Sequence, residues 1–327
     1  MNHLGKVSIL VTCFNKSEFL DSFRAQLESI KGYLSEIIIV DDLSQDGSRG
    51  ILESIAHEYS NITLVLNEGN LGSAASRNIA MEHASKDWIF FWDIDDCINF
   101  SILNDMISQA IQEESDLCRG QYAVSPSNEV IIEELPNESE PFSEISNSAK
   151  EIVRGMGYWR FLYSRRYLSI NKIIFIPAFA DLKSKFFILD DVFFLILVAS
   201  TKGKLSFSKT RKPVYFYHPT SHDASSWRRF QKQASIFPKA SLFCFSYIQS
   251  KENFNSGLAY ELILDKTIAH MRYLNFSHWI ISAPSFTRLI FLKVNSVNAL
   301  SKFRLIISVL LQSVKNSLAA QFHRTSS

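Results

Sequence analysis

The sequence predicts an α/β protein with a mixed, mostly parallel sheet flanked by helices. Over residues 7–92, short apolar segments alternate with segments of helical periodicity, and this order is typical of a parallel sheet built from βαβ units. Hydroxyl or acidic residues also follow three of the apolar segments. Loops that follow parallel strands converge at one edge of the sheet, where ligands bind. The pattern therefore predicts a ligand site at that edge.

Four strands and three helices are expected in this region. The strands are short apolar runs, and the lack of polar alternation in the first two indicates that these are buried. They are expected at Val7–Thr12, Ile37–Val40, Ile62–Leu66 and Trp88–Trp92. Helical spacing of apolar residues predicts helices at about 19–30, 50–57 and 72–85, the first preceded by the polar residues Asn15–Glu18 as caps and the last opened by Gly72.

Composition argues against several classes of protein. The net charge of +1 gives no field that would attract nucleic acid. The four cysteines lie far apart without a metal-binding pattern, so we interpret them as reduced thiols in a cytoplasmic protein. The first residues lack the apolar core and cleavage site of a signal peptide. The sequence contains no run of about 18 uncharged apolar residues, so a membrane-spanning helix is not expected.

The segment IFFWDIDD, residues 89–96, ends an apolar strand in three carboxylates. Carboxylates this close raise one another's cost of ionisation. A hard divalent cation, Mn²⁺ or Mg²⁺, would remove that cost, because such cations bind carboxylate, phosphate and water oxygens. The alternative interpretation is a helix N-cap with surplus surface acids. A second acidic strand end at Asp41 and Asp42 favours the metal site.

Four segments resemble, in order, the successive motifs of the GT-A family 2 glycosyltransferases. They are VSILVTCFNKSEFL, IIIVDDLSQDGS, NLGSAASRN and IFFWDIDD, within about residues 6–100. The resemblance implies a GT-A fold, a nucleotide-diphospho-sugar donor, a divalent metal and inversion at the anomeric carbon. Weaker similarity continues to about residue 230. We expect a catalytic domain over 1–230, with a nucleotide-sugar half at about 1–100 and an acceptor half at about 101–230. A helical, basic extension is expected over 231–327.

The resemblance assigns nucleotide-sugar binding to Thr12, Phe14, Asp42, Gly72, Arg77 and Asp93. Thr12 and Phe14 match the loop that surrounds the nucleoside, and Asp42 matches the residue that bonds the base. Gly72 and Arg77 match the segment beside the diphosphate, where glycine permits close approach and arginine offers a planar fork. The alternatives are an Asx cap for Asp42 and a structural ion pair with a strand-end aspartate for Arg77.

The same resemblance supplies candidates for the metal site. Asp95 matches the direct metal ligand, while Asp93 matches the acid nearer the sugar. A later aromatic segment, VYFYHPTSH, resembles the block in which a histidine joins the metal or the diphosphate, so His218 and His222 are both candidates. For either histidine the alternative is a purely structural role.

Catalysis by direct displacement needs a base to accept the proton of the acceptor hydroxyl. The segment ILDDVFF resembles the family's acidic pair at the start of a helix, and it assigns Asp191 as the base. A doubled N-cap before an apolar helix is the alternative. Trp159 falls where the family shapes its acceptor pocket. Two roles are expected for its ring, either stacking on a sugar or packing in the core.

The expected function is metal-dependent, inverting transfer of a sugar to the hydroxyl of a saccharide or lipid-linked saccharide, in surface polysaccharide synthesis. A nucleotidyltransferase would favour a glycine-rich, basic loop after the first strand, and residues 12–15 are neither. A dehydrogenase would carry GxGxxG there. Outside enzymes, a sugar-nucleotide-binding module without turnover is the alternative.

Two further segments carry expectations. Residues 126–151 are rich in Glu, Ser, Asn and Pro and predict a solvated insertion. No acidic residue follows Asp265, and residues 303–318 are strongly apolar with Lys302, Arg304 and Lys315 beside or within them. This tail is interpreted as a helix packed on the catalytic domain, or as a helix lying on an anionic membrane surface. The second interpretation implies peripheral attachment to the inner face of the membrane.

Overall fold

The structure is a computed structural model of the 327-residue chain. It describes residues 2–32, 35–124, 129–131, 140–142, 152–153, 157–176, 190–218, 225–271, 282, 284–286 and 309. The chain separates into two compact units, Met1–Thr220 and Ser221–Ser327. The sequence placed this boundary near residue 230.

The first unit is built on an eight-stranded mixed sheet with the order β3-β2-β1-β4-β10-β6-β11-β9. Its strands are β1 Val7–Cys13, β2 Glu36–Asp41, β3 Ile62–Leu66, β4 Trp88–Asp93, β6 Leu117–Arg119, β9 Glu140–Phe142, β10 Phe161–Ser164 and β11 Gly203–Phe207. A smaller sheet has the order β5-β12-β7-β8, formed by β5 Cys97–Ile98, β7 Gln121–Val124, β8 Glu129–Ile131 and β12 Pro213–Tyr217. The predicted fold class and the four predicted strands are confirmed. Strands β8 and β9 lie inside the segment expected to be a solvated insertion.

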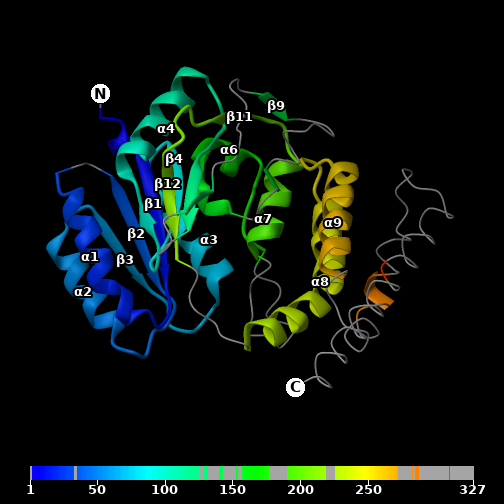
Figure 1. Cartoon of the computed structure of the whole chain (residues 1–327), viewed down its shortest axis with the longest axis horizontal. Helices are drawn as coiled ribbons and strands as arrows, with labels where there is room; N and C mark the ends of the chain where they lie inside the picture. The colour runs from blue at the N-terminus through cyan, green and yellow to red at the C-terminus, as the bar shows by residue number, and fades with distance from the viewer. Residues whose placement is uncertain are drawn as a thin grey trace. The chain divides into compact units, whose positions relative to one another are not determined.

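Helices connect these strands (Figure 1). They are α1 Leu20–Ser29, α2 Ser48–Glu58, α3 Ser73–His83, α4 Phe100–Gln112, α6 Arg165–Ile170 and α7 Asp190–Ala199, with 3₁₀ turns at Leu4–Lys6, Ser17–Phe19 and Tyr158–Arg160. The three helices expected within residues 19–85 are therefore present. The expected side-chain cap before the first helix is absent, because the 3₁₀ turn at Ser17–Phe19 leads directly into α1.

The two faces of the parallel strands bury different residues. On one face, Ile9, Val11, Phe90 and Trp92 belong to a core that α1, α2 and α4 complete. On the other, Phe91 makes edge contacts with Phe175 and Phe194, with centroids 5.3 and 5.8 Å apart. In Figure 1, α1 and α2 lie on one side of these strands and α3 lies on the other. Burial on both faces explains why β1, β2 and β4 read as continuous apolar runs, whereas the edge strand β3 is partly exposed.

The strand order reverses between β1 and β4. After β1 the chain builds outward through β2 to β3, all parallel, and then returns to the opposite side of β1 as β4. Thr12 is in register with Asp93 on one side of β1, and Cys13 is in register with Asp41 on the other. A reversal of this kind opens a crevice at the carboxyl ends of the strands, which is the usual ligand site of open α/β sheets.

In the second unit, α8 Ser225–Gln249 packs against α9 Ser256–Met271. The buried hydroxyls of Ser241 and Thr267 lie 2.8 Å apart across this contact. Both helices agree with the expected helical extension. The apolar tail segment 303–318 lies outside the described residues apart from position 309.

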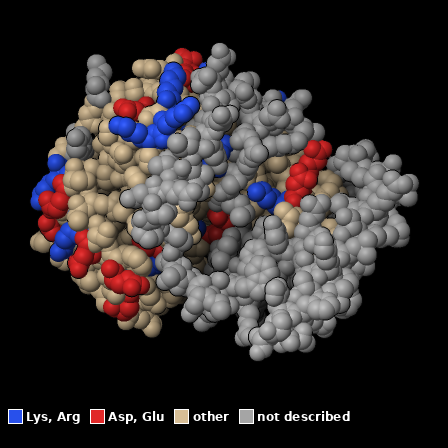
Figure 2. All heavy atoms as spheres, in the orientation of Figure 1, with Lys and Arg blue, Asp and Glu red and all other residues tan. Residues whose placement is uncertain are grey.

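Surface charge on the first unit is mixed. In Figure 2, acidic and basic side chains alternate along the edge formed by α1 and α2. Arg24 pairs with Glu58 at 3.7 Å, and Lys31 pairs with Glu28 at 3.1 Å. Such a surface fits the near-neutral net charge. Among the helices that the structure describes, none has the length and apolarity needed to cross a bilayer.

Candidate active site

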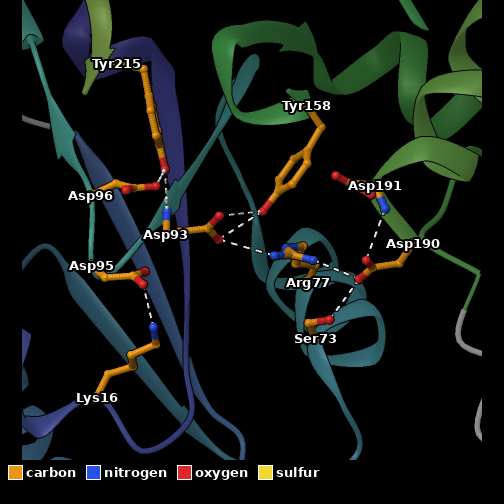
Figure 3. A network of polar contacts seen from close by, with 10 residues as sticks. All are labelled: Lys16, Ser73, Arg77, Asp93, Asp95, Asp96, Tyr158, Asp190, Asp191 and Tyr215. Carbon is orange, nitrogen blue, oxygen red and sulfur yellow. Dashed lines mark hydrogen bonds and ion pairs between the residues drawn. The ribbon is translucent and has the colours of Figure 1, made fainter. Parts of the chain in front are cut away.

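Three carboxylates of the turn after β4 point in different directions (Figure 3). Asp93 ends the strand, and the Asp96 amide closes the turn by donating to the Asp93 carbonyl at 2.9 Å. The Asp93 side chain faces Arg77 and Tyr158, Asp95 faces Lys16, and Asp96 faces Tyr215. Each acid therefore has its own hydrogen-bond donors, and these donors reduce the repulsion among the three carboxylates that the sequence led us to expect.

Asp96 is the buried, structural member of the three. Its carboxylate accepts from the Tyr215 hydroxyl at 2.8 Å and from the His218 amide at 2.6 Å. The same hydroxyl accepts from the Asp93 amide at 3.0 Å. Burial raises the pKa of Asp96 to about 8, and the charge of Asp93 adds to the shift. Asp96 thus fastens the end of β12 to the acidic turn.

Arg77 of α3 bridges two carboxylates that are distant in sequence. It donates to Asp190 at 2.8 Å and to Asp93 at 3.2 Å, and its side chain is 12% exposed. The guanidinium also lies 4.6 Å from the centroid of the Tyr158 ring, and the Tyr158 hydroxyl donates to both Asp93 oxygens at 2.9 and 3.0 Å. The ion pair with a strand-end aspartate, the alternative considered for Arg77, is present. Its role toward a diphosphate stays a prediction.

Asp191 begins α7 together with Asp190. Asp190 is buried and also accepts from the Ser73 hydroxyl at 2.8 Å. Asp191 keeps partial exposure, and its carboxylate accepts from the Val192 amide at 2.7 Å. Burial raises the pKa of Asp191 to about 8, and the Asp190 charge adds to the shift. A partly exposed carboxyl whose pKa lies near neutrality can both accept and release a proton, which suits a general base.

Asp42 organises the loop that leads into α3. Its carboxylate accepts from the Asn67 amide group at 2.9 Å and from the backbone amides of Leu71 and Gly72, both at 2.8 Å. Gly72 has φ of +86°, a conformation that glycine adopts without strain. An ionised carboxylate has about four acceptor positions, so one remains for a ligand. The predicted contact of Asp42 with a base stays a prediction.

The first strand-end loop lies beside this acid. The Asp42 amide donates to the carbonyl of Cys13 at 2.8 Å, which holds the two strand ends together. Phe14 is 45% exposed although it is aromatic, and Thr12, two positions earlier, is partly buried. Leu43 has φ of +65°, which is unusual for a branched residue. Such strain concentrates at functional sites, and it supports a ligand site at this edge.

Two of the candidate ligands carry donor atoms that suit a divalent cation. Asp95 presents a carboxylate that is 16% exposed, and His218 has a buried Nδ1 with no hydrogen-bond partner. Both are chemically suitable ligands. The described residues hold no cluster of three or more His, Cys, Asp or Glu side chains arranged around one point. A cation bound by one or two protein groups plus substrate phosphates needs no such cluster. His222 lies outside the described residues.

Aromatic rings border the site on the side of β12. Trp159 stacks on Tyr215 at 4.3 Å and on Tyr217 at 5.8 Å, with interplanar angles of 22° and 5°. Tyr122 makes an edge contact with it at 5.2 Å. Trp159 is therefore largely engaged by protein, whereas Tyr217 is 39% exposed. Stacking of Trp159 on an acceptor stays a prediction.

Sequence reasoning missed four members of the site: Lys16, Tyr158, Tyr215 and Tyr217. Tyr158 and Tyr215 donate to acids that are 65 and 119 positions away. No local pattern signals such partners. The one available signal is that the recognised motifs contain more acidic than basic residues. The acids must therefore find hydrogen-bond donors in other parts of the chain.

Known proteins share this architecture. The structure of S. aureus TarS 1–349 in complex with UDP-GlcNAc superposes with a TM-score of 0.66 at 18% identity, covering 95% of this chain and 89% of that one. The fold is therefore the GT-A glycosyltransferase fold. Residues 8–170 match the family described as Glycosyl transferase family 2, and this part of the chain belongs to that family.

Curated relatives align over part of their length. A cholesterol galactosyltransferase of Borreliella burgdorferi is 33% identical over 124 residues, which are 37% of this chain and 34% of the relative. EpsH of Bacillus subtilis is 29% identical over 235 residues, which are 69% of this chain and 64% of EpsH. The chain thus spans about a third to two thirds of the length of these relatives.

Proposed function

We propose that the protein is an inverting glycosyltransferase that moves a sugar from a nucleotide-diphospho-sugar to a hydroxyl of a saccharide or lipid-linked saccharide. One observation carries the proposal. Arg77 joins Asp190, the neighbour of the candidate base Asp191, to Asp93 at the end of β4. Candidate donor-binding and proton-accepting groups thus belong to one polar network (Figure 3).

The donor would occupy the crevice at the carboxyl ends of β1, β2 and β4. Phe14 offers an exposed ring for the nucleoside, and the remaining acceptor position of Asp42 suits an N–H of a base. The TarS fragment solved with UDP-GlcNAc supports a nucleotide-sugar at this kind of fold. The Arg77 guanidinium, which Asp93 and Asp190 already hold in place, would then bind the diphosphate.

Mn²⁺ or Mg²⁺ would be held by Asp95 and by the free Nδ1 of His218. When bound, such a cation neutralises the leaving diphosphate and acts as a Lewis acid.

Asp191 would take the proton of the acceptor hydroxyl. As the acceptor oxygen bonds to the anomeric carbon, the bond from that carbon to the diphosphate oxygen breaks and the proton passes to the Asp191 carboxylate. A single displacement of this kind inverts the anomeric configuration. Arg77 and Ser73 hold Asp190, so the start of α7 is fixed in place for the reaction.

On the acceptor side, the exposed ring of Tyr217 is the candidate for contact with a sugar. The Trp159 ring stacks on one face of the Tyr217 ring and supports it. The proposed role in surface polysaccharide synthesis comes from the usual employment of the family and not from any residue of the site. Peripheral attachment through the basic, apolar tail belongs to it as well. Full-length protein should bind vesicles rich in anionic lipid at low salt, and neutralising Lys302, Arg304 and Lys315 with glutamine should abolish that binding.

The proposal is tested by a thermal-shift screen of nucleotide-sugars with Mn²⁺ or Mg²⁺, followed by transfer assays. We expect one donor class to raise the melting temperature in a metal-dependent manner. Asp95→Asn should lose this shift, whereas Asp105→Asn, an exposed acid on α4, should retain it. Binding of a donor without hydrolysis or transfer would favour the non-catalytic module. A protein that no nucleotide-sugar stabilises would overturn the proposal.

A further inference from the structure

Lys16 is positioned as a competitor for the candidate metal ligand. Its ammonium contacts Asp95 Oδ2, and the two side chains are 30% and 16% exposed. Among the described residues, Lys16 is the only hydrogen-bond partner of the Asp95 side chain. Figure 3 shows Lys16 reaching Asp95 on the side away from Arg77 and Asp93. The pair is separate from the network that leads to the base.

The loop that carries Lys16 is fixed by hydrogen bonds to the loop before α2 and to the first residue of that helix. The Lys16 amide donates to the buried Ser48 hydroxyl at 3.0 Å. The flanking amides of Asn15 and Ser17 donate to Ser44 at 2.9 Å and to Asp46 at 2.9 Å. In addition, the Lys16 ammonium lies 5.1 Å from the centroid of the Phe19 ring. The backbone of this lysine is therefore held by hydrogen bonds on both sides, and its side chain reaches Asp95 from a fixed starting point.

A cation and an ammonium cannot share the same carboxylate oxygen at low cost. Two like charges a few ångströms apart repel, and the repulsion grows in a partly buried site. Besides the Nδ1 of His218, the acidic turn offers few other ligands, because both Asp93 oxygens accept from Tyr158 and both Asp96 oxygens are engaged by Tyr215 and His218. Metal binding by the protein alone must therefore displace Lys16, with little compensation from other groups.

We propose that Lys16 makes metal binding conditional on the donor. The ammonium neutralises Asp95 when no nucleotide is bound, and it yields that position when a diphosphate brings additional oxygen ligands for the cation. The inference rests on the proposed function, because it takes the cation to be shared with a nucleotide diphosphate. It predicts positive coupling between UDP and Mn²⁺ that depends on this one side chain.

The test measures Mn²⁺ binding to full-length protein without nucleotide, using the electron paramagnetic resonance signal of free Mn²⁺. Lys16→Met keeps the length of the side chain and removes the charge. We expect it to bind Mn²⁺ about tenfold or more tightly than the wild type does. Lys31→Met, which removes an exposed lysine paired with Glu28, is the matched control and should not change the affinity. In Lys16→Met/Asp95→Asn the gain should disappear.

Adding UDP to the same titration separates this inference from the proposed function. Wild type should bind Mn²⁺ more tightly with UDP, and the enhancement should shrink in Lys16→Met. Equal Mn²⁺ affinities of wild type and Lys16→Met without UDP would overturn the role of Lys16, as would a gain that survives Asp95→Asn. If UDP fails to enhance Mn²⁺ binding in either protein, the shared diphosphate site is wrong, and the conditional role of Lys16 is overturned with it. Circular dichroism of each variant establishes that it is folded.

Discussion

The Arg77 guanidinium and the Asp190 carboxylate lie 2.8 Å apart, although 113 positions separate them in the chain. Arg77 belongs to α3, in the half of the chain that matches the donor-site motifs, and Asp190 begins α7 beside the candidate base. The same guanidinium contacts Asp93 at 3.2 Å. One side chain therefore fixes the distance between the acidic strand end and the start of α7.

Arg77→Met should destabilise the protein, because it leaves Asp190 buried without its counter-ion. Breaking one side of a buried ion pair typically costs about 3–5 kcal/mol, and we expect a loss of that order in urea unfolding. Asp190→Asn in the Arg77→Met background should recover part of the loss, since the amide carries no charge. If Arg77→Met unfolds at the wild-type urea concentration, the bridge does not contribute to stability.

Asp191→Asn should separate binding from chemistry. The amide keeps the shape of the carboxylate and can still accept from the Val192 amide, but it cannot take a proton at neutral pH. Loss of a general base typically lowers a rate by about 10²–10⁴-fold. We expect donor affinity close to that of the wild type, measured by titration, together with a transfer rate reduced by this factor. A variant that transfers at the normal rate would remove Asp191 from the mechanism.

The pH dependence of transfer should report the raised pKa of Asp191. A base acts when ionised, and burial raises the pKa of this carboxyl to about 8. The rate should therefore increase with pH, by about tenfold per unit well below the pKa, and level off above it. Steady-state rates between pH 5 and 9 test this expectation. A rate that is constant from pH 5 upward would mean that the base has an ordinary carboxylate pKa.

Stability should change with pH in the opposite sense. The folded protein holds a proton on Asp191 that the unfolded chain releases near pH 4, so the native state binds more protons between about pH 4 and 8. The stabilising contribution is complete below the unfolded pKa and is lost as pH rises through the folded one. Wild-type stability relative to Asp191→Asn should therefore decline across this range in urea unfolding. A difference that stays flat would contradict the raised pKa.

Much of the fold was predictable because its signals are local. The runs that form β1 to β4 are apolar on both faces, and the helices between them have clear periodicity, so their order alone indicates a parallel sheet. Strand ends at Asp41 and Asp93 then identify the edge of the sheet that holds the site. The segment 126–151 was harder to interpret. Strands β8 and β9 form within it by pairing with β7 and β11, and its polar composition does not reveal these partners.

The directions of the site's side chains depend on tertiary contacts, and the sequence could not supply them. Three acids within four positions suggested a single cluster. Asp93, Asp95 and Asp96 nevertheless face separate partners, because Arg77, Lys16 and Tyr215 come from three different parts of the chain. Asp191 was placed from a motif, but its raised pKa results from burial and from Asp190 together. Residue types were thus predictable, and their electrostatic environments were not.

Tyr217 should determine affinity for the acceptor. The sequence offered Trp159 for this role, with core packing as the alternative. The Trp159 ring is stacked on Tyr215 and Tyr217, whereas the Tyr217 ring is 39% exposed. Burial raises the pKa of the Tyr217 phenol, and the charges of Asp96, Asp95, Asp93 and Asp191 add to the shift. The ring is therefore neutral at physiological pH and lies within the electrostatic reach of both the acidic turn and the candidate base.

A stacking contact of an aromatic ring is worth about 0.5–1.5 kcal/mol beyond the area it buries. Once the screen has identified a donor and an acceptor, Tyr217→Ala should raise KM for the acceptor by about three- to tenfold, in line with that energy. Tyr217→Phe keeps the ring and serves as the matched variant, so its KM should stay near that of the wild type. Hydrolysis of the donor in water does not involve the acceptor and should be equal in all three proteins. An acceptor KM that Tyr217→Ala leaves unchanged would exclude the ring from the acceptor site. A loss of donor hydrolysis in Tyr217→Ala would show instead that the ring supports Trp159 and the acidic turn.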